Sequence, residues 1–203
     1  MRIISGTKKG KKILLPDPEI TRPLRDSVKE NIFNVLIHSR KFKTNFNDIK
    51  VLDFFSGSGS FGIECISRGA AHVKFFELNS KTLNTLYRNL SNNFDKKKFE
   101  IIQKNFFNID SEQIIKNYKP DIIFLDPPYK IEKFDKILKF INSLSNINNL
   151  IIIIHVEKTK IINFENFKFN EERTYGISKI YFLRTNLWIF FSLLIEPQVV
   201  HRG

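Results

Sequence analysis

Short apolar runs alternate with amphipathic segments along most of the chain. Runs rich in Val, Ile, Leu and Phe have the length of buried strands and are bounded by polar or turn-forming residues. These runs are residues 51–55, 72–76, 99–103, 121–125 and 150–154. Between them, apolar residues recur at helical spacing in segments 61–68, 80–92, 110–117 and 131–143. The alternation predicts an α/β fold with a mostly parallel, doubly wound sheet.

The segments before and after this alternating region carry their own signals. A helical stripe follows residue 26, where Asp26 or Ser27 is the expected N-cap and Glu30 completes a capping box with Ser27. Near the end, strand-like segments 167–173 and 179–183 flank a turn and predict an antiparallel hairpin that closes the sheet edge. The pattern therefore predicts a main domain over residues 26–185.

Residues 1–25 form a separate basic arm in this interpretation. Ile3-Ile4 and the apolar residues 13–15 flank a lysine-rich turn from Gly6 to Gly10, which predicts a short hairpin with a basic tip. A hairpin of this kind could grip RNA, and a plain solvated N-terminus is the alternative. The candidate RNA-binding residues are Arg2, Lys8, Lys9, Lys11, Lys12, Arg22 and Arg25.

Composition narrows the possible partners. The formal net charge of +12 over 203 residues favours a polyanionic partner, although abundant Lys, Asn, Ile and Phe also fit nucleotide bias in the gene. A single cysteine, Cys65, excludes a disulfide framework and a Cys-rich zinc site, and no metal is expected. No apolar run approaches the roughly 18 residues of a membrane-spanning helix, and the start lacks a secretory signal. We therefore expect a cytoplasmic protein.

A glycine-rich loop follows the first apolar run. Gly57, Gly59 and Gly62 have the spacing G-x-G-x-x-G between a predicted strand and a predicted helix, where the backbone can approach a ligand closely. Glu77 lies twenty residues after Gly57, the separation at which an acid meets the hydroxyls of a ribose. This loop alone fits dinucleotide binding by an oxidoreductase equally well.

Polar residues mark the ends of four predicted strands. Asp53, Glu77, Asn105 and Asp126 all fall where ligands collect in a doubly wound sheet, at the carboxyl edge. Asn105 is placed to hydrogen-bond an adenine edge. His155 and Glu157 follow the fifth run, and no further residues accompany them in a metal-binding pattern, so a solvated or capping role is expected for both.

The tetrapeptide Asp126-Pro127-Pro128-Tyr129 ends the fourth run. Two prolines make a stiff, extended loop and leave the Pro127 carbonyl without a ladder partner. A carboxylate and a carbonyl side by side suit the two hydrogens of an –NH₂ group, and Tyr129 offers a face for a planar base. A tight Pro-Pro turn with no catalytic role is the alternative. The tetrapeptide looks like the DPPY motif of amino-methyltransferases.

Taken together, the motifs resemble those of the 16S ribosomal RNA guanine-N2 methyltransferase family known as RsmD. The resemblance covers about residues 1–184 and rests on R-I-I-S-G from Arg2, R-P-L-R-D-S-V-K-E from Arg22, the glycine loop, S-R-G-A from Ser67, the tetrapeptide and Tyr175-Gly176. It implies a class I, Rossmann-like fold with a seven-stranded sheet, S-adenosylmethionine as methyl donor, and one guanine of the small ribosomal subunit as acceptor. Residues 186–203 match nothing in the family and have no assigned role.

The resemblance also implies roles for individual residues. The expected cofactor-binding residues are Asp53, Phe54, Ser56, Gly57, Gly59, Glu77, Leu78, Asn105 and Phe106. The expected catalytic residues are Asp126, Pro127, Pro128 and Tyr129. We expect a monomer. The alternatives are a DNA adenine-N6 or protein-amide methyltransferase, a nucleotide-binding oxidoreductase, and a non-catalytic RNA-binding protein.

Overall fold

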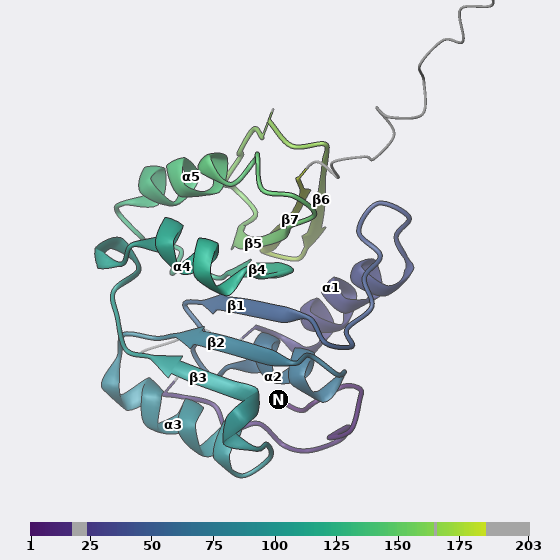
Figure 1. Ribbon diagram of the computed structural model, residues 1–203, viewed down its shortest axis with the longest axis vertical. Coiled ribbons are helices and arrows are strands. Elements are labelled where there is room, and N and C mark those ends of the chain that lie inside the picture. The colour runs from purple at the N-terminus through teal and green to yellow at the C-terminus, as the bar shows by residue number, and fades with distance from the viewer. Residues whose placement is uncertain (18–23, 165, 186–203) are drawn as a thin grey trace, which may run out of the picture.

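A twisted seven-stranded sheet organises the chain in the computed structural model, which describes residues 1–17, 24–164 and 166–185. The strand order is β3-β2-β1-β4-β5-β7-β6, which Figure 1 shows from the bottom of the view to the top. The strands are β1 (Lys50–Phe54), β2 (His72–Phe76), β3 (Phe99–Ile102), β4 (Ile122–Leu125), β5 (Ile151–Glu157), β6 (Phe169–Tyr175) and β7 (Ser178–Arg184). The α-helices of the described residues are α1 (Asp26–His38), α2 (Ser60–Ser67), α3 (Ser80–Ser91), α4 (Ser111–Tyr118) and α5 (Phe134–Ser143), with short 3₁₀ turns at Lys96–Lys98 and Phe106–Asn108.

Helices cover both faces of the sheet. One apolar cluster joins α1, α2, α3 and the N-terminal segment to one face, and a second joins α4 and α5 to the other. Phe61 of α2 stacks on Phe124 of β4 at 4.1 Å between ring centroids. On the opposite face, Phe140 of α5 meets the edge of Phe54 at 5.8 Å. The doubly wound architecture predicted from the alternation of apolar runs is confirmed.

Strand β5 extends further than its apolar run indicated. It pairs with β4 in parallel from Ile151 to Ile154, but with β7 in antiparallel fashion from Ile151 to Glu157. Because β7 supplies backbone partners for the last three residues, the strand continues through His155. The predicted hairpin is also present, as β6 and β7 pair from Phe169↔Arg184 to Tyr175↔Ser178.

The expected basic hairpin at the N-terminus is not confirmed. Its pairing amounts to one isolated antiparallel bridge between Arg2 and Lys12, and the segment instead packs into the core through buried Ile3 and Ile13. Gly6 makes the close approach possible: it has φ +82°, and a Cβ there would overlap the carbonyl group of Ser67 in α2. This segment thus combines a short antiparallel pairing, in which the Ile3 N–H donates to Lys11 at 2.9 Å and the Ile13 N–H to Met1 at 3.0 Å, with tertiary docking.

The start of α1 also differs from the prediction. Arg25, rather than Asp26 or Ser27, occupies the N-cap position, and no side chain caps the helix. Asp26 lies in the first turn, where its Oδ1 accepts from the Arg2 N–H at 3.4 Å and lies 3.6 Å from Lys29 Nζ. Contacts with Arg2 of the N-terminal segment and with Lys29 one turn along α1 therefore replace the local cap. Arg22 and the tail 186–203 lie outside the described residues.

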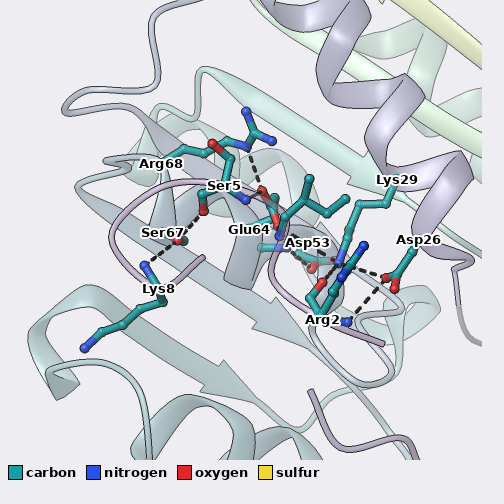
Figure 2. A network of polar contacts seen from close by, with 11 residues as sticks. Arg2, Ser5, Lys8, Asp26, Lys29, Asp53, Glu64, Ser67 and Arg68 are labelled. Atoms are coloured by element: carbon teal, nitrogen blue, oxygen red, sulfur yellow. Dashed lines mark hydrogen bonds and ion pairs between the residues drawn. The ribbon is translucent and has the colours of Figure 1, made fainter. Parts of the chain in front are cut away.

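A buried polar network holds the N-terminal segment against α1 and α2 (Figure 2). At its centre, the fully buried Glu64 accepts the backbone N–H groups of Ile4 at 2.7 Å and Ser5 at 2.9 Å. Arg68 Nε donates to the same carboxylate at 2.8 Å, and Lys29 Nζ lies 4.0 Å from it. Burial lowers the pKa of Lys29, which Glu64 and Asp26 partly offset.

No helix formed by the described residues has the length and apolar character needed to cross a membrane.

Candidate active site

A cavity of about 840 Å³ lies where the carboxyl ends of β1, β2 and β4 meet the face covered by α1–α3. Strand alternation explains which side chains reach it. In β1, Val51 and Asp53 point toward α1–α3, whereas Leu52 and Phe54 point toward α4 and α5. The cavity has the size range typical of small-molecule sites.

The expected site residues that line this cavity come from four strand ends. They are Asp53, Ser56, Gly57, Glu77, Leu78, Asn105, Phe106, Asp126, Pro127, Pro128 and Tyr129. Phe54 and Gly59 do not line it. Phe54 is fully buried between Phe76 and Phe106, at 4.5 and 5.1 Å between ring centroids.

Asp53 is the most deeply buried carboxylate of the cavity, with 1% of its surface exposed. Its Oδ2 accepts the N–H of Gly62, in the first turn of α2, at 3.0 Å. Burial raises the pKa of Asp53 well above its usual range, the Gly62 N–H opposes this shift, and the Asp126 and Glu77 carboxylates add to it. A cation bound in the cavity would therefore favour the ionised form of Asp53.

The loop between β1 and α2 adopts left-handed conformations at several positions. Phe55, Gly57 and Gly59 have φ values of 61°, 55° and 79°. A Cβ at Gly59 would overlap Leu86 of α3, whereas one at Gly57 would meet nothing within 4 Å. The lack of a side chain at Gly59 thus allows the loop to pack closely against Leu86, whereas at Gly57, which lines the cavity, it leaves space for a ligand.

Glu77 connects the end of β2 to the glycine loop. Its Oε2 accepts the Gly57 N–H at 2.9 Å, and its Oε1 accepts the N–H groups of Leu78 at 2.8 Å and Asn79 at 2.9 Å. These backbone donors fix the carboxylate at the rim of the cavity. Leu78 is half-exposed beside it, at 55%.

Asn105 follows β3 and begins the turn Phe106–Asn108. Its Oδ1 accepts the Phe107 N–H at 3.0 Å, so this oxygen is already engaged in capping the turn. Phe106 is buried at 8% exposure, yet its ring reaches the cavity wall. The turn thus presents an amide and an aromatic ring to the same part of the cavity.

Asp126 and the prolines extend from β4 along the cavity. The Asp126 N–H donates to the Phe54 carbonyl at 3.3 Å, which continues the parallel pairing of β4 with β1 by one residue. Within residues 1–17, 24–164 and 166–185, no group donates a hydrogen bond to the Pro127 carbonyl oxygen. A carboxylate and a carbonyl acceptor therefore stand side by side at the cavity.

His155 belongs to this site, although the sequence interpretation gave it a solvated or capping role. It lies inside β5, is only 5% exposed, and places Nδ1 2.8 Å from Asp126 Oδ1. The available signal was register: His155 follows Ile154 and Asp126 follows Leu125, and these two apolar residues pair between β5 and β4. The apolar run alone ended one residue too early to reveal it.

The basic residues of the arm lie away from the cavity. Thr7 and Lys8 bind Ser67, the last residue of α2, whereas Ser60 at the first residue of α2 lines the cavity. None of the described candidates Arg2, Lys8, Lys9, Lys11, Lys12 and Arg25 lines the cavity, and Arg22 is outside the described residues. The lysines that do line it, Lys104 and Lys130, were not predicted.

Solved structures of methyltransferases share this architecture. A Haemophilus influenzae protein described as a methylase is 28% identical with a TM-score of 0.67, covering 92% of this chain and 98% of that one. An RNA methyltransferase from Salinibacter ruber in complex with S-adenosyl-L-homocysteine is 12% identical with a TM-score of 0.58, covering 83% and 96%, and shows likeness of fold alone. The fold and the motif-bearing cavity define the class as S-adenosylmethionine-dependent methyltransferases.

The family follows from sequence comparison. A family model described as "Conserved hypothetical protein 95" matches residues 1–184, and the chain belongs to this family. Ribosomal RNA small subunit methyltransferase D of Haemophilus influenzae is 32% identical over 183 residues, 87% of this chain and 90% of the relative. The protein of the same name from Buchnera aphidicola is 35% identical over 161 residues, covering 79% and 80%. The resemblance to the RsmD family is thereby confirmed.

Proposed function

We propose that this protein methylates the exocyclic N2 amine of one guanine in 16S ribosomal RNA, with S-adenosylmethionine as donor. The observation that carries the proposal is the pair of acceptors at Asp126 and Pro127 beside the acid-lined cavity. The family and its relatives named as ribosomal RNA small subunit methyltransferases support the RNA substrate. A ribosomal substrate also supports a cytoplasmic location.

The cavity suits the cofactor in charge and size. S-adenosylmethionine carries a sulfonium and an ammonium group, and three carboxylates, those of Asp53, Glu77 and Asp126, line the cavity. Asp53 and the loop at Gly57 are proposed to hold the methionine part, Glu77 the ribose, and Asn105 with Phe106 the adenine. When bound, the cofactor supplies an activated methyl group.

The chain's own residues must make a weak nucleophile react. The lone pair of a guanine N2 amine is delocalised into the ring, so the flat amine attacks poorly. Asp126 and the Pro127 carbonyl are placed to accept its two hydrogens, which favours the pyramidal form with the lone pair directed at the methyl group. The proton released on transfer leaves from N2 toward the Asp126 carboxylate.

Placement accounts for much of the remaining rate. The cavity would hold the cofactor and the base in one enclosed space, which would lower the entropic cost of their encounter. Tyr129 lines the cavity next to Asp126 and offers a face for the base. The base must leave its stack to enter, as for other enzymes that modify bases.

The decisive experiment uses methyl-labelled S-adenosylmethionine with unmodified small ribosomal subunits, deproteinised 16S RNA, and duplex DNA, followed by digestion to nucleosides. We expect label in N2-methylguanosine, reduced about 100-fold or more by Asp126→Ala, with cofactor affinity nearly unchanged. Label in N6-methyladenine from DNA would replace the substrate assignment by the alternative amino-methyltransferase. Loss of cofactor binding in Asp126→Ala would contradict the role given to Asp126.

Assembly and oligomeric state belong to the same proposal. The comparison of subunits with deproteinised RNA identifies whether the small ribosomal subunit is the partner. We propose that the protein acts as a monomer, and light scattering of the purified chain tests this directly.

A further inference from the structure

A chain of side-chain contacts runs from Asp126 through His155 and Tyr129, both of which line the cavity, to Ser178. His155 Nδ1 lies 2.8 Å from Asp126 Oδ1, and the Tyr129 hydroxyl lies 3.4 Å from His155 Nε2 and 3.3 Å from Ser178 Oγ. The rings of Tyr129 and His155 meet edge to face at 5.9 Å. These residues come from β5, β7 and the loop after β4, so three segments converge on one carboxylate.

Hydrogen-bond chemistry fixes the tautomer of His155. An ionised carboxylate only accepts, so the short contact to Asp126 requires a hydrogen on Nδ1. In the neutral imidazole, Nε2 is then an acceptor, and the Tyr129 hydroxyl is the group placed to donate to it. For the neutral imidazole, the Nδ1–H tautomer therefore satisfies both ring nitrogens.

We infer that His155 is a positioning residue of the methyl-transfer site. Its Nδ1–H holds Asp126 Oδ1, which fixes the rotation of the carboxylate and leaves Oδ2 as the oxygen presented to the amine. Tyr129 locks the imidazole from the other side, so that stacking of the base and orientation of the carboxylate depend on the same contacts. This inference rests on the proposed function, because it assigns His155 a task in that reaction.

Geometry separates this role from that of an ordinary packed histidine. A 5% exposed imidazole could be held by any acceptor, but the acceptor here is the Asp126 carboxylate, whose side chain is still 20% exposed to the cavity. Loss of the imidazole leaves that carboxylate free to rotate without removing any group that lines the cofactor end of the cavity. The expected effect is therefore on kcat rather than on cofactor binding.

The first test compares three variants by melting temperature, cofactor Kd and steady-state kinetics. His155→Leu removes the donor, and we expect kcat to fall about 10- to 100-fold, the factor that corresponds to a hydrogen bond to a charged group, with cofactor Kd unchanged. His155→Asn returns an N–H near the position of Nδ1, and it should regain most of the lost kcat. His72→Leu is the matched control, because His72 contacts Tyr118 at the opposite end of the sheet, and its kcat should equal that of the wild type.

The second test needs no catalysis. Nitrogen NMR of protein labelled with ¹⁵N-histidine should show the Nδ1–H tautomer for His155, assigned by the signal missing in His155→Asn, and Asp126→Ala should change it. An Nε2–H tautomer, or a His155 signal that is unchanged in Asp126→Ala, overturns the inference. So does a His155→Leu variant that folds and keeps full kcat.

Failure of the inference can be told from failure of the proposed function. If the labelled nucleoside is not N2-methylguanosine, the proposed substrate is wrong, and the His155 variants are compared on the amine that is methylated. If no amine is methylated, the NMR tautomer still decides the geometry on which the inference depends.

Discussion

Replacement of Glu64 by glutamine tests whether the buried network holds the N-terminal segment in place. The carboxylate accepts two backbone N–H groups, from Ile4 and Ser5, and the Nε–H of Arg68, all within 2.9 Å. Glutamine keeps one accepting oxygen, but its NH₂ group replaces the other and would face at least one of these N–H donors without forming a hydrogen bond. It also removes one of the two anionic neighbours of Lys29, which is fully buried.

The magnitude follows from the partners that remain. Removal of one member of a buried ion pair costs about 3–5 kcal/mol because the other charge stays buried. Lys29 keeps the Arg2 carbonyl at 2.7 Å and Asp26 at 3.6 Å, so we expect the lower end, about 3 kcal/mol. For a chain of this length, that corresponds to a melting temperature lower by roughly 6–12 °C.

Urea unfolding followed by circular dichroism measures the change in the free energy of unfolding. Glu100→Gln is the matched control, since Glu100 pairs with Lys74 at 2.8 Å but its side chain is 50% exposed. This exposed pair should contribute less than about 1 kcal/mol. Equal destabilisation by the two substitutions would refute the reasoning, because burial would then not determine the cost.

Three further predictions concern close approach, charge and RNA. Gly6→Ala should destabilise far more than Gly10→Ala in urea unfolding, because both have φ near 82° but only Gly6 lies against backbone; equal costs would contradict the close-approach argument. Because the pKa of Asp53 is raised in the folded state, that state binds more protons than the unfolded chain, and the free energy of unfolding should fall as pH rises above the unfolded pKa of 3.8. Asp53→Asn should flatten this pH dependence of the melting temperature. The same substitution should weaken cofactor binding measured by calorimetry. Lys130→Ala should raise KM for RNA more than Lys8→Ala, since Lys130 lines the cavity and the Lys8 backbone N–H binds Ser67 at the far end of α2; the reverse order would make the arm the main RNA contact.

The sequence was informative wherever local pattern and strand alternation decided the outcome. Apolar runs predicted the parallel core, and the polar residues at the carboxyl ends of β1, β2 and β4 do meet in one cavity. The same alternation, applied residue by residue, would have placed Phe54 on the opposite face from Asp53. The resemblance had given Phe54 a cofactor role that its burial between Phe76 and Phe106 does not suggest.

The features that escaped prediction depend on contacts between distant segments. His155 belongs to β5 because β7 pairs with it in antiparallel fashion, which no run of apolar residues encodes. Asp26 looked like a helix cap because capping is a local signal, but its side chain binds Arg2 and Lys29 instead. In both cases, a tertiary partner overrode the local pattern.

The N-terminal motifs acquire a structural explanation from α2. The first turn of this helix supplies the Gly62 N–H to Asp53, and two residues later Glu64 receives the N-terminal segment. Asn89 adds a second connection, because its Nδ2 donates to the carbonyls of Leu14 and Ser58, one in that segment and one in the glycine loop.

The backbone of the N-terminal segment is thus hydrogen-bonded to the elements that shape the end of the cavity proposed for the cofactor. This packing gives its motif residues a structural role that does not involve RNA. Lys29 binds the Arg2 carbonyl, and Glu64 binds the Ile4 and Ser5 amides. This packing does not explain the side chains of the two lysines in the turn between Gly6 and Gly10, Lys8, which is partly buried, and Lys9, which is exposed. A defect in docking of the segment should therefore reach cofactor binding through α2 and the glycine loop, whereas neutralisation of those lysines should affect the RNA alone.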